Sequence, residues 1–293
     1  MTDDGRLQLV DAHLHLWDLA NDWYPAMQDP AAMKAYESLG DVTRMARDFL
    51  VPELREEDGA VEIAGVVHVS AVSAPRVHLD EARWLEAVLD QLGVPAVTVG
   101  SLEADQSRAE IEADLDAQNQ GGRLRGARVL AGIDPASATA ADLCAVLAER
   151  GLVLDLVAKP AAIPAHLELL GRHPHLAVVL EHAGWPEATD EAGLLQWREA
   201  IGALAALPNV SCKVSGLGMA THALDADTLR PWLEGCLDAF GPERCIFGSN
   251  FPVEAMYGGF EELVDSVRGV VDRLPEADRR AFWAENARRV YRI

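Results

Sequence analysis

Two histidines near the start of the chain, His13 and His15, are the first side chains whose type and spacing suit chemistry. Side chains alternate between the faces of a β-strand, so a spacing of two places both imidazoles on one face, about 6.6 Å apart along the strand. Neutral imidazoles can ligate a divalent metal, and an imidazole beside an imidazolium can polarise a carbonyl or bind a carboxylate. The pair alone is a weak signal, so its use depends on the residues that the fold brings beside it.

Polar residues of functional types also follow the other apolar segments of the chain. An isolated polar residue at the end of a strand usually serves a turn. Here such residues recur at corresponding ends, which read HLH at 13–15, HVSA at 68–71, LE at 102–103, GAR at 126–128, LDL at 154–156, EHAG at 181–184, KVSG at 213–216 and GSNFP at 248–252. This recurrence indicates a convergent pocket that His182 shares with His13 and His15.

The apolar segments predict the strands that must position these residues. Each is short and nearly continuously apolar, as strands buried on both faces are, and each precedes a stretch with helical periodicity. The predicted strands are 9–14, 63–69, 96–102, 124–130, 152–156, 177–180, 210–214 and 245–247. Eight βα units in one chain predict a single (β/α)₈ TIM barrel over residues 1–293, with the catalytic side chains at the carboxyl ends of the strands.

The segment at about 17–58 interrupts this alternation after the first predicted strand. It contains Trp17, Trp23, Tyr24 and Pro25, and it is long for a connection in a compact domain. We expect a loop and small helices beside the mouth of the barrel, with Trp17 near the substrate. The sequence leaves open whether this insertion is a lid or ordinary packed structure.

The amino-acid composition limits the classes of partner that we expect for this protein. The chain has 47 acidic and 25 basic side chains, a formal net charge of -22, so its surface would repel the phosphates of nucleic acid. Its four cysteines are widely spaced, and no apolar run approaches the roughly 18 residues of a membrane span. We therefore expect a cytoplasmic protein with a small-molecule substrate, and we leave a homo-oligomer open.

Four motifs carry a family resemblance. They are VDAHLHLWD on the first predicted strand, VVLEHAGWP on the sixth, CKVSGLG on the seventh and CIFGSNFPVE on the eighth. In this order and over nearly the whole chain, they resemble the amidohydrolase-2 branch of the amidohydrolase superfamily, in particular its fuconolactonase-like and pyrone-dicarboxylate-lactonase-like hydrolases.

The resemblance implies a hydrolase that opens a small polar lactone, carboxylated or sugar-derived, by adding water at the mouth of the barrel. Carried onto the matching positions, it implies that His13, His15 and His182 polarise the carbonyl or hold a metal. Members of the family use either no metal or one divalent metal, for which zinc is expected here. Arg128 would face an anionic group of the substrate.

Position 250 departs from the family pattern. The usual aspartate of the eighth strand is Asn250 here, and an amide cannot accept a proton at neutral pH. Asn250 would orient the water while another group takes its proton, or an activated substrate would need no strong base, or hydrolysis would be lost.

Four side chains are candidates for the missing base: His68, Asp155, His182 and Glu254. We favour His68, in which case the rate should fall below an apparent pKa near neutrality. Glu181 alternates with His182 and is expected to point away from the pocket. Asp155 and Lys213 are kept as candidate substrate contacts, although Asp155 could instead anchor a loop and Lys213 could seal the rim.

Two other functions stay open from the sequence alone. One is a zinc-dependent decarboxylase of the same branch, which would need a stoichiometric metal. The other is a catalytically silent barrel that binds a small molecule, for which Asn250 is the motivating residue.

Overall fold

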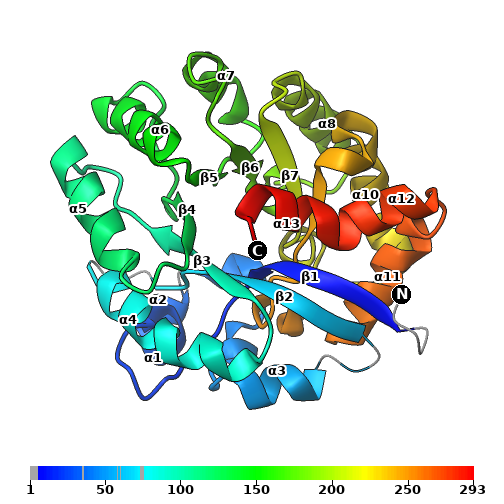
Figure 1. Cartoon of the computed structure of the whole chain (residues 1–293). Helices are drawn as coiled ribbons and strands as arrows, with labels where there is room; N and C mark the ends of the chain where they lie inside the picture. The colour runs from blue at the N-terminus through cyan, green and yellow to red at the C-terminus, as the bar shows by residue number, and fades with distance from the viewer. Residues whose placement is uncertain (1–5, 35, 58, 60, 73–75) are drawn as a thin grey trace.

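Eight parallel strands form the centre of the molecule, as the alternation of apolar segments predicts (Figure 1). The computed structural model describes residues 6–34, 36–57, 59, 61–72 and 76–293. The strands are hydrogen-bonded in sequence order: β1 (Leu7–Leu14), β2 (Val61–Val69), β3 (Ala96–Ser101), β4 (Leu124–Arg128), β5 (Val153–Leu156), β6 (Val178–Leu180), β7 (Val210–Val214) and β8 (Cys245–Phe247). The predicted (β/α)₈ barrel is confirmed.

The barrel closes where the first strand meets the chain beyond the eighth. The backbone N–H of Asn250 donates to the carbonyl of His13 at 2.7 Å, and the N–H of His15 donates to that of Phe251 at 2.9 Å. These bonds fix His13, His15 and Asn250 relative to one another through the backbone alone.

Helices surround the sheet (Figure 1). The outer ring contains α4 (His78–Leu89), α5 (Arg108–Gln118), α6 (Ala138–Arg150), α7 (Ile163–Gly171), α8 (Glu191–Ala205), α10 (Ala226–Phe240) and α11 (Phe260–Val271). Side chains of Ser137, Asp190 and Asp225 cap α6, α8 and α10 by accepting backbone N–H groups of the first turn. Shorter helices are α9 (Gly218–Thr221) after β7 and α12 (Glu276–Arg280) and α13 (Asn286–Tyr291) at the carboxyl terminus.

The segment between β1 and β2 contains the short helices α1 (Pro25–Gln28), α2 (Pro30–Lys34) and α3 (Val51–Glu57). The isolated bridge between Trp17 and Phe49 joins its two ends. This arrangement keeps the segment beside the carboxyl end of β1, where His15 lies.

The inside of the barrel is filled by small and branched side chains, including Val67, Val97, Val153, Val179 and Ile246, which form one buried cluster. The carboxyl-terminal α13 crosses the amino end of the barrel (Figure 1). Among the described residues, no helix combines the length and the apolar character needed to span a membrane. Because α13 covers the amino end, the open end is the carboxyl end of the barrel, which holds the polar residues predicted from sequence.

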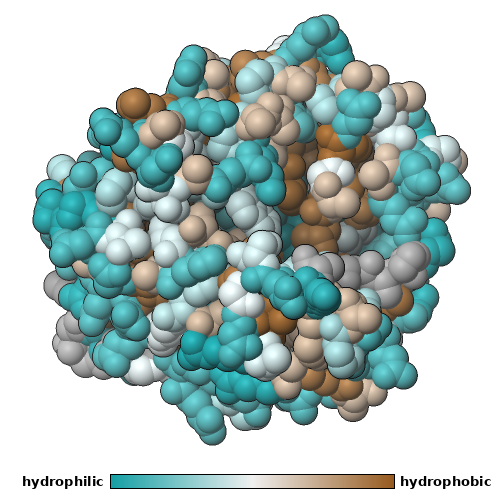
Figure 2. Space-filling model, turned by 180° about the vertical axis from the view of Figure 1, so that it is seen from behind, coloured by the Kyte–Doolittle hydropathy of each residue, from teal (hydrophilic) through white to brown (hydrophobic). Residues whose placement is uncertain are grey.

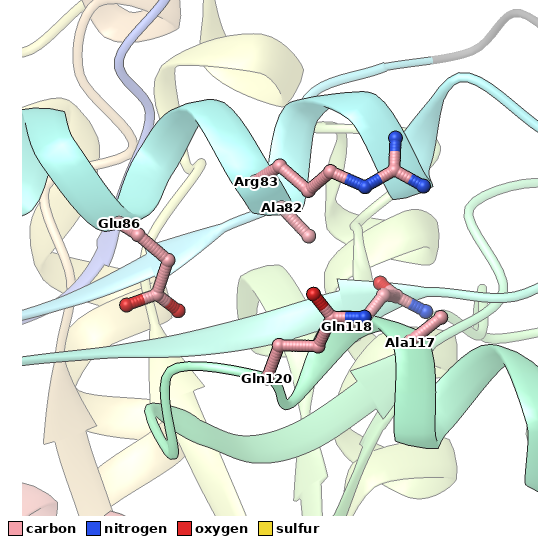
Figure 3. A pocket seen from close by; sticks show the side chains of 6 residues that line it. All are labelled: Ala82, Arg83, Glu86, Ala117, Gln118 and Gln120. Atoms are coloured by element: carbon pink, nitrogen blue, oxygen red, sulfur yellow. The ribbon is translucent and has the colours of Figure 1, made fainter.

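The space-filling view in Figure 2 and the close-up in Figure 3 show hollows in two parts of the molecule. Figure 2 shows the face opposite to that of Figure 1, where brown hydrophobic side chains gather in a hollow that teal hydrophilic side chains surround. Figure 3 shows a groove of about 150 Å³ between α4 and α5, lined by Ala82, Arg83, Glu86, Ala117, Gln118 and Gln120. None of the predicted site residues lines that groove, so it is separate from the site.

Candidate active site

A cavity of about 130 Å³ lies at the carboxyl ends of the strands. Its polar lining consists of His15, Arg128, His182 and Asn250. The rest of the lining is mostly apolar: Trp17, Met27, Tyr36, Leu39, Met45, Ala71, Leu130, Trp185, Met219 and Val253. A few polar groups within an apolar cavity are typical of sites that bind small molecules.

The segment between β1 and β2 supplies one wall of this cavity. Trp17, Met27, Tyr36, Leu39 and Met45 all belong to it. Trp17 is 2% exposed, and its Nε1–H donates to the carbonyl of Arg47 at 2.7 Å. The wall is therefore held by its own packing and hydrogen bonds.

His13 and His15 meet through their rings. Their Nε2 atoms are 3.2 Å apart. The Nδ1 atom of His15 is 2.7 Å from the carbonyl oxygen of Val69, which can only accept, so this nitrogen carries the proton and Nε2 has the lone pair in the neutral ring. His13 can then donate through Nε2, which leaves its Nδ1 as a bare nitrogen.

His182 reaches the cavity because the backbone turns sharply after β6. The strand ends at Leu180 and continues into a short 3₁₀ segment, Glu181–Gly184, in which φ is 51° at His182 and 53° at Ala183. The Nδ1 atom of His182 is 3.0 Å from Ser215 Oγ. Gly216 lies against the ring, where an added Cβ would approach Nδ1 to 2.4 Å, so only glycine fits there.

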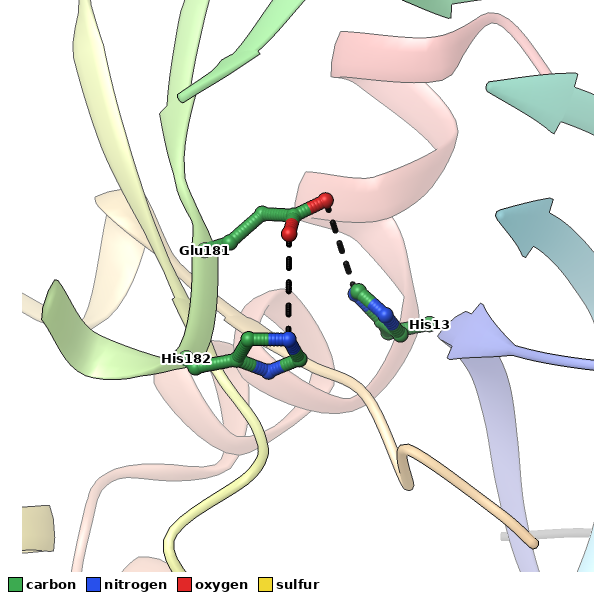
Figure 4. Close-up of side chains that lie close together, drawn as sticks. All are labelled: His13, Glu181 and His182. Carbon is green, nitrogen blue, oxygen red and sulfur yellow. Dashed lines mark ion pairs between the residues drawn. The ribbon is translucent and has the colours of Figure 1, made fainter. Parts of the chain in front are cut away.

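Glu181 also points into the site, and the prediction that it faces away is wrong. Its Oε2 atom is 3.7 Å from His182 Nε2, and its Oε1 atom is 4.0 Å from His13 Nδ1 (Figure 4). Alternation along β6 places Glu181 on the inner face with Val179. His182 joins it there because the left-handed backbone ends the alternation.

Arg128, at the end of β4, holds this carboxylate. Its Nη1 donates to Glu181 Oε2 at 2.9 Å, and its Nη2 donates to the carbonyl of Ser70 at 2.6 Å. The two side chains are 4% and 1% exposed. Arg128 thus lines the cavity while its charge is paired with Glu181.

Asn250 lines the cavity with φ of 56°. Its Nδ2–H donates to Glu254 Oε1 at 3.4 Å, and the other carboxylate oxygen of Glu254 accepts the backbone N–H of Gly218 at 3.0 Å. Burial raises the pKa of Glu254 to about 8. Glu254 therefore contacts the site through Asn250 and does not line the cavity.

Five sequence-predicted residues lie outside the cavity lining: His13 and Glu254, described above, and His68, Asp155 and Lys213. His68 is buried, and its Nε2 accepts the backbone N–H of Leu16 at 3.0 Å. Asp155 and Lys213 pair with one another, and Tyr291 from α13 donates to Asp155 at 2.8 Å. Lys213 and Asp155 therefore belong to the packed interior of the barrel.

Burial keeps the imidazoles uncharged. Loss of hydration lowers the pKa of His182 to about 4 although Glu181 opposes this shift, and it lowers the pKa of His68 to about 4. The pKa values of His13 and His15 also lie well below their ordinary range, because of burial first and nearby positive charge second. Burial alone would raise the pKa of Glu181, but the charge of Arg128 and its other neighbours outweigh it, so the carboxylate is ionised.

The donor atoms fit a divalent metal. Within the described part of the chain, one atom each from His13, Glu181 and His182 lie within 4.8 Å of one another. Nδ1 of His13 and Oε1 of Glu181 are buried without a hydrogen-bond partner. Bare imidazole nitrogen and carboxylate oxygen are the ligands that zinc prefers. The grouping contains Glu181 where the sequence predicted His15.

Sequence reasoning missed Glu181 and most of the apolar wall. The predicted strand ended at Leu180, as β6 does, so the two-residue spacing of Glu181 from Val179 was a usable signal that the two side chains share one face. Met27, Tyr36, Leu39 and Met45 carry no polar or periodic signal, so nothing in the sequence marks them as cavity residues.

Comparisons with known proteins agree with this geometry. The amidohydrolase family model matches residues 10–293. An L-fucono-1,5-lactonase from Burkholderia multivorans is 31% identical over 97% of this chain and 96% of its own length. The crystal structure of an amidohydrolase from the same species, with bound zinc, has a TM-score of 0.81 at 30% identity and covers 98% of this chain and 99% of that one. An amidohydrolase 2 from Bifidobacterium longum subsp. infantis has a TM-score of 0.72 at 20% identity, covers 98% and 99% of the two chains, and shows the fold alone.

The fold and the matched family define a barrel hydrolase. The chain belongs to the amidohydrolase family, as the four sequence motifs predicted.

Proposed function

We propose that this chain opens small polar lactones by adding water to the lactone carbonyl. Membership of the amidohydrolase family and the lactonase name of a relative at 31% identity support this activity. The observation that carries the proposal is the position of His182, whose uncharged imidazole lines a small cavity while its Nε2 lies 3.7 Å from the buried Glu181 carboxylate.

His182 is the proton acceptor in this proposal. Of the four candidate bases, it alone lines the cavity in the described structure. When the oxygen of water attacks the carbonyl carbon, the released proton moves to His182 Nε2. The imidazolium that forms is stabilised by the Glu181 carboxylate, as a buried carboxylate stabilises the imidazolium of a catalytic triad.

Asn250 and Arg128 act on the oxygen atoms of the reacting group. Both line the cavity, and both carry N–H donors. Donors aimed at the developing negative charge of the carbonyl oxygen lower the barrier to its formation. The ring C–O bond then breaks, and His182 returns the proton to the leaving ring oxygen, so that lactone and water give one hydroxy acid.

The asparagine at position 250 is accommodated by this division of roles. It orients water or carbonyl through hydrogen bonds, and a different residue takes the proton. The choice of His68 as the base is less well supported, because its Nε2 is occupied by the backbone of Leu16 and its ring does not line the cavity.

His13 and His15 form the side of the site that is nearest to β1. Without a metal, the Nε2–H of His13 donates to His15, and His15 is fixed to Val69. His13, Glu181 and His182 would hold a zinc ion, with His15 Nε2 as a further donor beside them, and the role of His182 as proton acceptor therefore applies to the chain without a metal. A zinc ion bound there would polarise the carbonyl and lower the pKa of a bound water.

A panel of lactones tests the proposal. Purified chain should release acid from at least one sugar-derived or carboxylated lactone in a pH-indicator assay, with and without added zinc or manganese. If no lactone of the panel is hydrolysed under either condition while the chain is folded, the proposal fails. Metal analysis of the same preparation addresses the decarboxylase alternative, which requires bound metal.

The silent-barrel alternative, the homo-oligomer and the cytoplasmic location stay predictions. Hydrolysis gained by Asn250→Asp in an otherwise inert chain would support the silent barrel.

A further inference from the structure

We infer that the cavity selects uncharged lactones and rejects carboxylated ones, because its only lining cation among the described residues, Arg128, is already paired with Glu181. This inference rests on the proposed lactone hydrolysis and names the substrate class of that same site. It replaces the expectation that Arg128 faces an anionic group of the substrate.

The positive charge of Arg128 is balanced by the Glu181 carboxylate. Nη1 donates to Glu181 at 2.9 Å and Nη2 donates to the carbonyl of Ser70 at 2.6 Å. Nε has no partner and each Nη keeps a second N–H, so the ion pair can still donate hydrogen bonds but carries no net charge. A second carboxylate brought to this ion pair would give two negative charges around one positive charge in a site with little water.

In the chain without a bound metal, the other groups around the cavity add no positive charge. Within the described residues, Arg128 is the only lysine or arginine side chain in the cavity lining. Lys159 lies at the rim over the ring of Trp185, and its ammonium pairs with Glu187 at 3.4 Å. The formal net charge of -22 for the whole chain has the same sign, so the long-range field also repels anions.

The apolar lining fits an uncharged ring. Four apolar side chains of the cavity lining offer surfaces for the faces of a sugar ring or for a methyl substituent. They are Trp17, Leu130, Trp185 and Met219. A carboxylate placed against these side chains would lose its hydration without gaining an ionic partner, which is costly. A hydroxyl loses less, because it can share hydrogen bonds with Asn250 and Arg128.

The experiment compares matched six-membered sugar lactones that differ only in the substituent on the ring carbon next to the ring oxygen. The substituents are methyl, hydroxymethyl, carboxamide and carboxylate. Carboxamide and carboxylate have nearly the same size and differ in charge. We expect kcat/KM for the carboxylate to be lower than for the carboxamide by about 100-fold, since a like charge in a buried site costs several times the thermal energy.

Variants connect the selection to the ion pair. In Glu181→Gln the guanidinium loses its carboxylate partner, and the ratio of carboxylate to carboxamide turnover should rise by about tenfold or more. Glu168→Gln is the matched control. It removes the same charge from an exposed position on α7, where Glu168 pairs with Arg172, and should leave the ratio unchanged.

The outcomes separate the two proposals. Equal or faster turnover of the carboxylate in the unmutated chain would overturn the inference and leave lactone hydrolysis standing. Equally poor turnover of carboxamide and carboxylate would assign the selection to size and would also overturn it. Hydrolysis of none of the four, nor of any other lactone, would remove the proposed function itself. Each of these outcomes is measured on the unmutated chain, so the test does not depend on whether Glu181→Gln folds.

Discussion

Two buried ionic groups inside the barrel differ in how fully their polar atoms are paired. In the packed interior of the barrel, Asp155 divides its two carboxylate oxygens between Lys213 and Tyr291. At the carboxyl end, Oε1 of Glu181 and Nδ1 of His13 are buried and have no hydrogen-bond partner among the described residues. An unpaired buried polar atom costs about 1–3 kcal/mol of stability.

The difference indicates which group serves the fold and which serves a ligand. A fully paired group closes the barrel and holds α13 against it. The unpaired atoms of the other group lower the stability of the folded chain, and a bound metal or substrate would supply their missing partners. Both groups have similar residue types, so the pairing of their atoms, and not their composition, separates structure from function.

The largest effect that this comparison predicts is on catalysis at His182. Replacing it by Gln removes the proton acceptor, so kcat should fall by about 10²–10⁴-fold on an uncharged lactone. His166→Gln is the control, because His166 is a buried histidine on α7 whose Nδ1 contacts only the carbonyl of Ala162. Loss of kcat in both variants, or in neither, would contradict the assigned role.

At the buried pair of Lys213 and Asp155 the expected effect is on stability. Lys213→Met leaves the Asp155 carboxylate buried without its cation and should lower the free energy of unfolding by about 3–5 kcal/mol. Urea unfolding of the purified variant measures it. In the double variant Lys213→Met with Asp155→Leu no charge is left unpaired, so much of the stability should return. A stable Lys213→Met chain with greatly reduced kcat would place Lys213 in the site after all.

A smaller effect sharpens the comparison at Glu254, the carboxyl behind Asn250. Its pKa is raised from 4.5 to about 8 by burial, so the folded chain binds this proton more tightly than the unfolded chain. The stability gained is present below pH 4.5 and is lost as the pH rises through about 8. The unmutated chain should lose stability relative to Glu254→Gln over this range, at up to about 1.4 kcal/mol per pH unit. If the free energies of unfolding of the two chains, measured in urea, change equally between pH 5 and 8, this prediction is contradicted.

The sequence predicted the barrel because its strands are marked twice, by apolar runs and by the polar residues that follow them. The positions of His15, Arg128, His182 and Asn250 follow from the rule that strand ends meet at one rim, and the structure brings these four together around one cavity.

The rest depends on features that a residue pattern does not carry. Glu181 was misplaced because the left-handed backbone at His182 breaks the alternation. His68, Asp155 and Lys213 are ordinary strand-end residues in the sequence, and only their partners in the fold show that they are occupied elsewhere. Complete burial lowers the pKa of His68 to about 4, so the kinetic pKa near neutrality that we expected of His68 as the base stays untested and has no support in the structure.

The pH dependence of kcat/KM on an uncharged lactone tests most directly whether the buried, uncharged imidazole of His182 takes the proton from water. This quantity reports the groups that titrate in the free enzyme. Because burial holds the pKa of His182 at about 4, the rate should stay level from neutral pH down to about pH 5 and fall with a midpoint near 4, in a chain that circular dichroism shows to be folded throughout. A midpoint near 6.5 would mean that a solvated group takes the proton, and it would contradict the mechanism.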